Sequence, residues 1–438
     1  MTVVTARSKT TLTSECFRLH PAKVTARSRP TVNASINSVK RFHILLTSIG
    51  VVLFSFGLLV FKIGQPPTYV IDEKVYVESA RNLLHVGADA TLDSHPPLAK
   101  FLIAGGMKLV GDNPAGWRLA STLFGSFTVL GVFLWTYVLL GDYALAVTAS
   151  LLTIFNNFLY VMSRLAMLDV FYFAFVVWAL LAFTAAITLP LGLPKRRLLM
   201  LASGVLFGLG CSCKWTAVVS MAVAGAVAGF LFLRNRHNVR QIGLPILVLS
   251  FVILPSAVYC LSYWPQFIAI HKPFAIRDFF AMNAYVWRSH VAAPGNPAIG
   301  CPWYRWFFRT TPLRVMDYLM GNYVVMWGGV GALLICAVKF LRAPALAEGL
   351  IISLYAANVF QWVIIPEKMT QYYYYYPPAT LLSLAIVLAC ASMPGAKIAG
   401  VRPVLIAVAG AGVFFLICYP KMAGLQAPFD CALTCWPY

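Results

Sequence analysis

The sequence is poor in acidic residues and in charge generally. Asp and Glu together number 14 in 438 residues, against 34 Lys and Arg, and charged residues of both signs make up only 11% of the chain. Hydrophobic residues make up 60% of it. A chain so poor in charge cannot cover a water-facing surface, which excludes a soluble globular domain. The composition therefore predicts an all-α polytopic membrane protein whose solvent is the bilayer.

Sequence signatures of several other classes are missing. No Gly-rich phosphate-binding loop is visible, and the ten cysteines show no metal-ligand spacing. The net charge of +20 raises the question of nucleic-acid binding, but the basic residues flank apolar runs instead of lining one face. Membrane contact is therefore predicted and nucleic-acid binding is not. Cys431 and Cys435 lie in a polar tail, where a disulfide and two free thiols both remain open.

The chain divides into three segments. Residues 1–42 are basic and rich in Ser and Thr, which predicts a disordered cytoplasmic tail, with an organellar transit peptide as the alternative. Residues 43–420 form the membrane domain, and residues 421–438 form a short tail. Most of the eleven apolar runs in the membrane domain are long enough to span a bilayer; the runs are 43–61, 115–140, 142–162, 165–189, 198–213, 215–233, 241–263, 315–340, 349–365, 378–393 and 401–419.

Basic residues predict the orientation of these spans. Lys and Arg cluster in short loops on one side, which assigns that side to the cytoplasm; the clusters lie at 40–41, 195–197, 234–240, 339–342 and 397–402. The N-terminus is then inside and the C-terminal tail is extracytoplasmic. The long loops 62–114 and 264–314 and the tyrosine-rich segment 372–376 share the outer face.

The outer loop 62–114 holds several of the rare acidic residues. Asp72 and Glu73 follow the first apolar run, and Asp93, His95 and Lys100 come later in the loop. Carboxylates beside a membrane are costly unless solvated or paired, and they are usual groups for proton abstraction, so this is the predicted catalytic loop. The alternative is that the aspartates only cap helices. Helical spacing of apolar residues predicts two amphipathic helices here, the second with its apolar face along the membrane surface.

Further charged and aromatic residues lie on the same face. Arg118 and Arg164 stand at span ends, where a guanidinium suits a phosphate or a fixed carboxylate. The alternatives for Arg164 are an ion pair with Asp169 or snorkelling to the interface. Lys214 could equally be an interface anchor, and Trp303 either stacks on sugar or anchors the bilayer.

Taken in order, these motifs resemble the protein O-mannosyltransferase family. Asp72-Glu73 and the segment 93–100 (Asp-Ser-His-Pro-Pro-Leu-Ala-Lys) are similar to that family's first luminal loop. The further matches keep the family's order and extend the similarity over roughly residues 40–420; they are 116–118, 163–169, 210–215, 285–290, 301–306 and 372–378. Three features depart from the family: Ala99 replaces a glycine, Lys368 stands where an arginine is common, and the loop 264–314 is too short for a MIR domain. A short form without a MIR domain resembles the bacterial type.

The resemblance implies a GT-C glycosyltransferase in a bacterial cell membrane. It would transfer mannose, with inversion, from a polyprenyl-phosphate donor to Ser or Thr hydroxyls of exported proteins, in contact with the secretion machinery. Asp72 would be the base, assisted by Glu73, and Arg118 or Arg164 would stabilise the departing phosphate. The residues implied to bind substrate or to organise the loop are Asp93, His95, Lys100, Asp169, Lys214 and Trp303. No cofactor is required, and the spacing of the carboxylates does not demand a divalent metal.

Three alternatives remain open on the sequence. Related enzymes that glycosylate lipids share the acidic loop, so a lipid or cell-envelope glycan is the alternative acceptor. A secondary transporter would carry ionisable residues in mid-span and show two repeated halves with broken helices, features that the sequence does not show. An inactive structural subunit could retain the loop.

Overall fold

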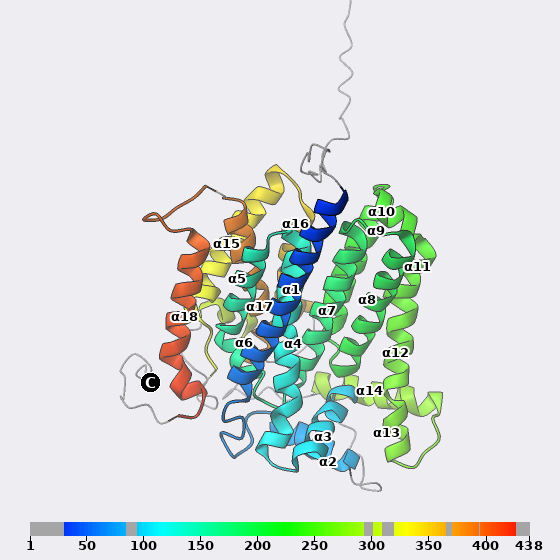
Figure 1. The fold of residues 1–438 in the computed structure, drawn as a ribbon. Helices are drawn as coiled ribbons and strands as arrows, with labels where there is room; N and C mark the ends of the chain where they lie inside the picture. Colours follow the sequence, from blue (N-terminus) through cyan, green and yellow to red (C-terminus); the bar gives the residue numbers. More distant parts are fainter. Residues whose placement is uncertain are drawn as a thin grey trace, which may run out of the picture.

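The computed structural model describes residues 30–84, 94–292, 301–308, 319–364, 370–393 and 395–425. Within these ranges the regular structure is helical, without a β-strand and with one isolated bridge between Ile398 and Val401. Most of the helices run side by side in one bundle (Figure 1). The predicted all-α architecture is confirmed.

Each of the eleven predicted apolar runs contains a helix. Among the described residues, nine helical segments are long and apolar enough to cross a membrane: Phe42–Val60 of α1 (Pro30–Val60), α4 (Pro114–Leu140), α7 (Leu168–Thr188), α8 (Leu193–Cys213), the stretch Leu244–Ala269, α15 (Tyr323–Arg342), α16 (Leu346–Ile364), Tyr372–Ala391 and α18 (Pro403–Met422). The stretch Leu244–Ala269 comprises α11 (Leu244–Val248), η1 (Leu249–Ile253), α12 (Leu254–Ser262) and α13 (Trp264–Ala269). The other two runs give the shorter apolar helices α5 (Tyr143–Ile154), continued by α6 (Asn157–Met162), and α9 (Ala217–Leu233).

Several helices extend beyond the apolar runs. α8 begins at Leu193 with a proline in its first turn, and the 3-10 turn η3 (Tyr372–Tyr375) leads into α17 (Tyr376–Ala391), which also has proline in its first turn. Proline is tolerated there because first-turn N–H groups have no intrahelical acceptor. α1 begins at Pro30, inside the segment 1–42 that was predicted to be disordered. This boundary is corrected, since extending an existing helix costs far less than starting one.

The buried centre of the bundle is formed by α7 and α17. In each of these two spans 83% of the apolar window is buried, against 11% in α1 and 22% in α18. α7 packs on α4 and α8, and α17 packs on α15 and α16. The peripheral helices therefore present their apolar side chains to lipid, whereas polar groups at the ends of α7 and α17 are shielded from it.

The two predicted helices of the loop 62–114 are present as α2 (Glu73–Leu84) and α3 (Leu98–Val110). They lie at one end of the bundle together with α14 (Ile276–Ala292), opposite α10 (His237–Ile242) (Figure 1). α3 meets α4 so closely that a Cβ on Gly106 would lie 2.5 Å from the carbonyl oxygen of Gly116. Its apolar face, including Ile103 and Met107, is buried against protein, which corrects the prediction that this face lies along the membrane surface.

Candidate active site

Asp72 and Glu73 leave a tight turn in different directions. The Glu73 amide donates to the Val70 carbonyl at 3.1 Å, and Ile71 between them has a φ of +51°. A β-branched residue rarely adopts this left-handed conformation, which costs about 1–3 kcal/mol and is often found at functional sites. The turn gives two adjacent carboxylates separate environments.

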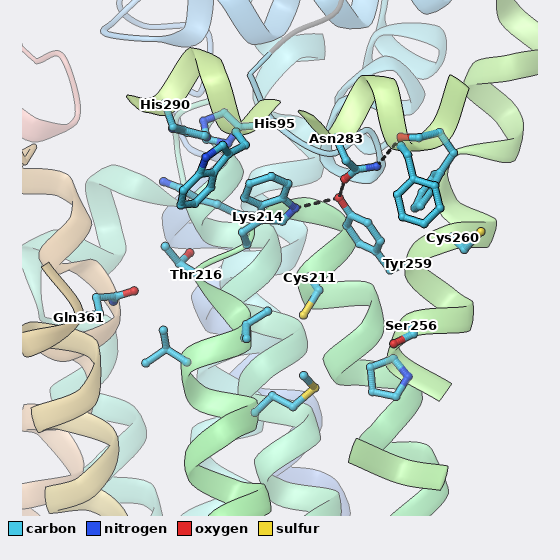
Figure 2. A pocket seen from close by; sticks show the side chains of 18 of the residues that line it. His95, Cys211, Lys214, Thr216, Ser256, Tyr259, Cys260, Asn283, His290 and Gln361 are labelled. Atoms are coloured by element: carbon cyan, nitrogen blue, oxygen red, sulfur yellow. Dashed lines mark hydrogen bonds between the residues drawn. The ribbon is translucent and has the colours of Figure 1, made fainter. Parts of the chain in front are cut away.

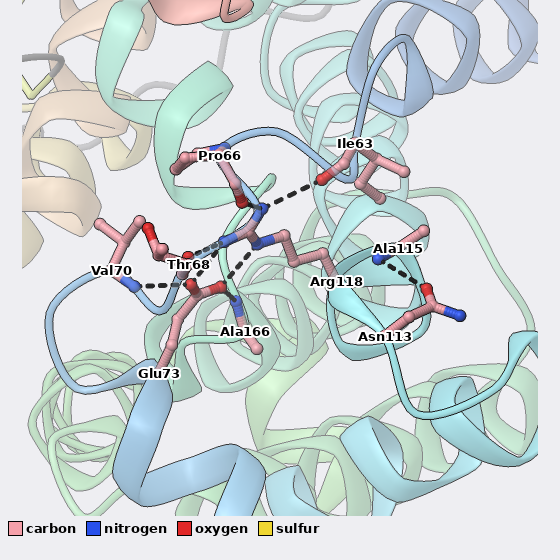
Figure 3. A network of polar contacts seen from close by, with 9 residues as sticks. All are labelled: Ile63, Pro66, Thr68, Val70, Glu73, Asn113, Ala115, Arg118 and Ala166. Atoms are coloured by element: carbon pink, nitrogen blue, oxygen red, sulfur yellow. Dashed lines mark hydrogen bonds and ion pairs between the residues drawn. The ribbon is translucent and has the colours of Figure 1, made fainter.

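Glu73 is fully buried and paired with Arg118 (Figure 3). Arg118 donates from Nε and Nη2 to the two carboxylate oxygens at 2.8 and 2.7 Å. The amides of Ala166 and Val70 donate to the same oxygens at 2.7 and 2.9 Å. A carboxylate offers about four lone-pair sites, and here four donors occupy them. Glu73 therefore holds the loop to the bundle and has no open oxygen for a substrate.

The two arginines predicted to bind phosphate are bonded to the last turn of α1 and to the chain that follows it. The other N–H groups of Arg118 donate to the carbonyls of Ile63, Pro66 and Thr68 at 3.2, 2.8 and 3.1 Å. Arg164 donates to the carbonyls of Leu59 and Lys62 at 2.8 and 3.0 Å, and to that of Phe61. All five donors of Arg118 are thus used, and its side chain is fully buried. A phosphate could reach Arg118 only by breaking one of these bonds.

Asp72 has a different environment from Glu73. It is half-buried, and its Oδ2 accepts a hydrogen bond of 2.6 Å from the Tyr373 hydroxyl of η3. Among the residues that the structure describes, Oδ1 has no hydrogen-bond partner, and only the main-chain carbonyl of Asp72 bonds to α2, from the Tyr76 amide at 3.2 Å. The carboxylate is therefore not a helix cap. One anchored and one open oxygen is an arrangement suited to a general base.

A second buried ion pair lies next to Tyr373. Lys214, the residue that follows α8, donates from Nζ to both carboxylate oxygens of Asp169 at 2.9 and 3.0 Å. The same Nζ lies 4.4 Å from the ring centre of Tyr374 and 5.6 Å from that of Tyr373. The alternative pairing of Arg164 with Asp169 is therefore wrong. Lys214 is also too deeply buried to be an interface anchor.

A cavity of about 860 Å³ opens beside these residues, bounded by α8, α9, α12, α14 and α16. Most of its wall is apolar, whereas Lys214, His95 and His290 gather at one end (Figure 2). Trp215 donates to the Tyr259 hydroxyl at 2.8 Å, and that hydroxyl donates to Asn283 of α14 at 2.5 Å. α14 is thereby fastened over the cavity. A long apolar space with one polar end suits an amphiphilic ligand.

His95 lies at this polar end, with its ring centre 4.8 Å from that of His290. Lys100 donates from Nζ to the His95 carbonyl at 2.9 Å, which ties the loop to the start of α3. Burial is the main cause that holds the pKa of His95 well below its usual value, and the charges of Lys214, His290 and Lys100 lower it further. His95 is therefore neutral near pH 7.

The remaining predicted residues lie away from the cavity or outside the described chain. Trp303 packs on Phe360 with ring centres 5.6 Å apart and does not line the cavity, so sugar stacking there is not favoured. Asp93, Lys368, Cys431 and Cys435 lie outside the described residues. Within the described ranges, no three side chains of metal-binding type come together.

Two residues that the sequence indicated only as members of longer motifs take central places. Tyr373 holds Asp72, and His290 faces His95. Tyr373 stood in a run of five tyrosines, and His290 stood in a segment that matched the family, but neither context indicated a partner. The sequence therefore showed residue types that suit the site, but it did not show which side chains would contact each other.

The chain is similar in sequence to known mannosyltransferases. The sequence profile of the family described as dolichyl-phosphate-mannose-protein mannosyltransferase matches residues 94–264. The polyprenol-phosphate-mannose–protein mannosyltransferase of Corynebacterium glutamicum is 25% identical over 415 residues, covering 75% of this chain and 78% of that protein. Its counterpart in Mycobacterium tuberculosis is 30% identical over 232 residues, or 46% and 44% of the two chains. The chain is thus similar, over 75% of its length, to a protein named as a polyprenol-phosphate-mannose–protein mannosyltransferase.

Solved structures identify the fold of the chain. The S. cerevisiae protein O-mannosyltransferase Pmt1-Pmt2 complex matches with a TM-score of 0.75 at 11% identity, over 88% of this chain and 91% of that chain. ArnT from Cupriavidus metallidurans matches with a TM-score of 0.60 at 16% identity, over 88% and 66%. Likeness at such identities shows the fold alone, and that fold is GT-C. The predictions of a GT-C fold, a multi-pass membrane protein and a glycosyltransferase are confirmed.

Replacing Arg118 by Ala tests whether the Glu73–Arg118 pair is structural. We expect a loss of about 3–5 kcal/mol in the free energy of unfolding, because a buried carboxylate is left without its partner. Thermal unfolding of the purified protein in detergent measures this. Arg81→Ala is the control, since Arg81 pairs with the partly exposed Asp112 and should cost about 0–1 kcal/mol. An Arg118 variant of wild-type stability with weakened donor use would restore the phosphate role.

The neutral state of His95 predicts a pH-dependent stability. Below about pH 6.5 an unfolded chain binds a proton at this histidine that the folded protein does not bind, so stability falls as the pH falls. We expect the unfolding temperature of the wild type to drop more than that of His95→Gln between about pH 7.5 and about pH 5.5. Equal drops in the two proteins would mean that folded His95 takes up the proton as readily as the unfolded chain.

Proposed function

We propose that the chain transfers a hexose, mannose by its relatives' names, from a polyprenyl-phosphate donor to Ser or Thr hydroxyls of exported proteins. The observation that carries this proposal is the position of Asp72. Its open carboxylate oxygen stands in the same polar cluster as Lys214, which lines an apolar cavity suited to a lipid chain. The names of the Corynebacterium and Mycobacterium relatives supply the donor, the sugar and the protein acceptor.

The donor is expected to enter the cavity with its polyprenyl chain along the apolar wall. A volume of about 860 Å³ lies within the range of ordinary ligand pockets and holds part of such a chain. Its phosphate would lie at the polar end, where Lys214 carries a positive charge and His95 and His290 can form hydrogen bonds. These residues replace Arg118 and Arg164 as the proposed phosphate contacts.

The proposed reaction is a single displacement at the anomeric carbon. As the acceptor hydroxyl attacks, its proton passes to the open Oδ1 of Asp72, and the bond between the anomeric carbon and the phosphate oxygen breaks. The bond electrons leave with the polyprenyl phosphate, and attack from the opposite side inverts the configuration. Glu73 and Arg118 contribute by holding the turn that presents Asp72.

The proposed location is the extracytoplasmic side of a bacterial cell membrane. The catalytic turn and α14 lie at one end of the bundle, and α10 with its flanking arginines lies at the other (Figure 1). Basic loops favour the cytoplasmic side of a membrane, so the active end faces outward. A Ser or Thr acceptor would meet the site there, after or during export by the secretion machinery.

Asp72→Asn tests the base. The amide cannot accept the proton, so we expect transfer from labelled polyprenyl-phosphate-mannose to a Ser/Thr-rich peptide to fall by about 10²–10⁴-fold, with donor binding retained. Glu78→Gln on the exposed face of α2 is the matched control and should transfer at the wild-type rate. Full activity of Asp72→Asn would remove the proposed base. If the labelled sugar appears in a lipid fraction and never in the peptide, the acceptor is a lipid instead of a protein.

Val219→Trp tests the lipid cavity. Val219 lines the cavity from α9, and an indole there would occupy space proposed for the polyprenyl chain, so we expect the donor KM to rise by about tenfold or more. The control is Ala226→Trp, on the exposed side of the same helix and away from the cavity wall. If both variants keep the wild-type KM, the donor chain lies elsewhere.

A further inference from the structure

The Tyr373 hydroxyl is the only described side chain that bonds to the Asp72 carboxylate. The two residues are 301 positions apart in sequence, and the hydrogen bond between them is 2.6 Å long. Tyr373 is almost fully buried, at 2% exposure, whereas Asp72 is half-buried. A buried tyrosine hydroxyl that meets a partly exposed carboxylate can fix that carboxylate without closing it to a substrate.

The ring of Tyr373 is itself held in place by a stack of aromatic and charged groups. It meets Tyr374 edge to face with ring centres 4.7 Å apart, and Tyr374 stacks on Trp362 at the same distance. Lys214 lies over Tyr374 and is held from behind by both oxygens of Asp169. Cation–π and stacking contacts of this kind restrict the ring, so the hydroxyl has a defined direction.

Asp72 is thus constrained from two sides. The strained turn at Ile71 fixes its main chain, and Tyr373 fixes Oδ2, so Oδ1 is left pointing in one direction. A carboxylate that rotated freely would lose part of the orientation on which proton transfer depends.

We propose that Tyr373 is the positioning residue for Asp72, which orients the carboxylate through Oδ2 and stabilises its charged form before the acceptor hydroxyl arrives. This inference rests on the proposed function, because it assigns Asp72 the role of base. Tyr373 does not receive the proton and does not touch the sugar in this proposal. Its effect passes entirely through Asp72.

The neighbouring tyrosine provides a matched comparison. Tyr375, two residues further along η3, is also fully buried, but its hydroxyl pairs with the Tyr355 hydroxyl at 2.6 Å and meets no carboxylate. Tyr373→Phe and Tyr375→Phe therefore each remove one buried hydroxyl from the same turn. Only the first of these hydroxyls acts on the base.

The test is the pH dependence of sugar transfer by the full chain in membranes, with polyprenyl-phosphate-mannose as donor and a Ser/Thr-rich peptide as acceptor. We expect Tyr373→Phe to lower kcat by about 10- to 100-fold, the usual effect of one hydrogen bond to a charged group, with little change in the donor KM. The acid limb of its kcat profile, where kcat falls as the pH is lowered, should move to higher pH. The reason is that the Asp72 carboxylate loses a hydrogen bond that favours its charged form. Tyr375→Phe should leave that limb in place.

A second replacement covers the case in which Tyr373→Phe fails to fold, as judged by its unfolding temperature in detergent. 3-Fluorotyrosine at position 373 keeps the ring and strengthens the hydroxyl as a donor, so the acid limb should move to lower pH. If the acid limb of the kcat profile stays at the wild-type pH in the fluorotyrosine protein and in folded Tyr373→Phe, the positioning role is overturned. Absence of transfer by the wild type, in contrast, would overturn the proposed function itself.

Discussion

The position of the whole outer loop depends on the buried ion pair between Glu73 and Arg118. Each charge would be unstable alone in this environment, and together with main-chain groups they satisfy every donor and acceptor of both side chains. The pair joins the chain between α1 and α2, the first turns of α4 and the segment before α7. One interaction therefore fixes three segments that are distant in sequence, and Asp72 takes its place from them.

The contrast between Asp72 and Glu73 shows how neighbouring carboxylates acquire different roles. Glu73 has four donors and serves stability, whereas Asp72 has a single described donor and keeps one oxygen open. The left-handed turn at Ile71 separates the two side chains. Such a division is common at active sites, where a rigid, fully satisfied group supports a partly satisfied one.

The fold was largely predictable because bilayer solvation leaves a strong mark on sequence. Apolar runs located the helices, and the spacing around Pro96 and Pro97 located the start of α3. The site was predictable only by residue type. Asp169 pairs with Lys214 and Tyr373 with Asp72 through packing between distant helices, and hydropathy and periodicity carry no information on such pairs. Arg118 has the chemistry of a phosphate ligand, and its five bonds to protein become visible only in three dimensions.

A balance of charge explains why the proposed reaction does not need these arginines at the phosphate. Glu73 with Arg118 and Asp169 with Lys214 form two neutral pairs, whereas the Asp72 carboxylate is bonded to a tyrosine hydroxyl. In the proposed displacement, Asp72 loses its negative charge as it takes the proton, and the departing polyprenyl phosphate gains one. The total charge of the site is the same before and after. In this proposal no new net charge has to be stabilised in a poorly hydrated space, so Lys214 at the cavity end can serve the phosphate while the two arginines hold the loop.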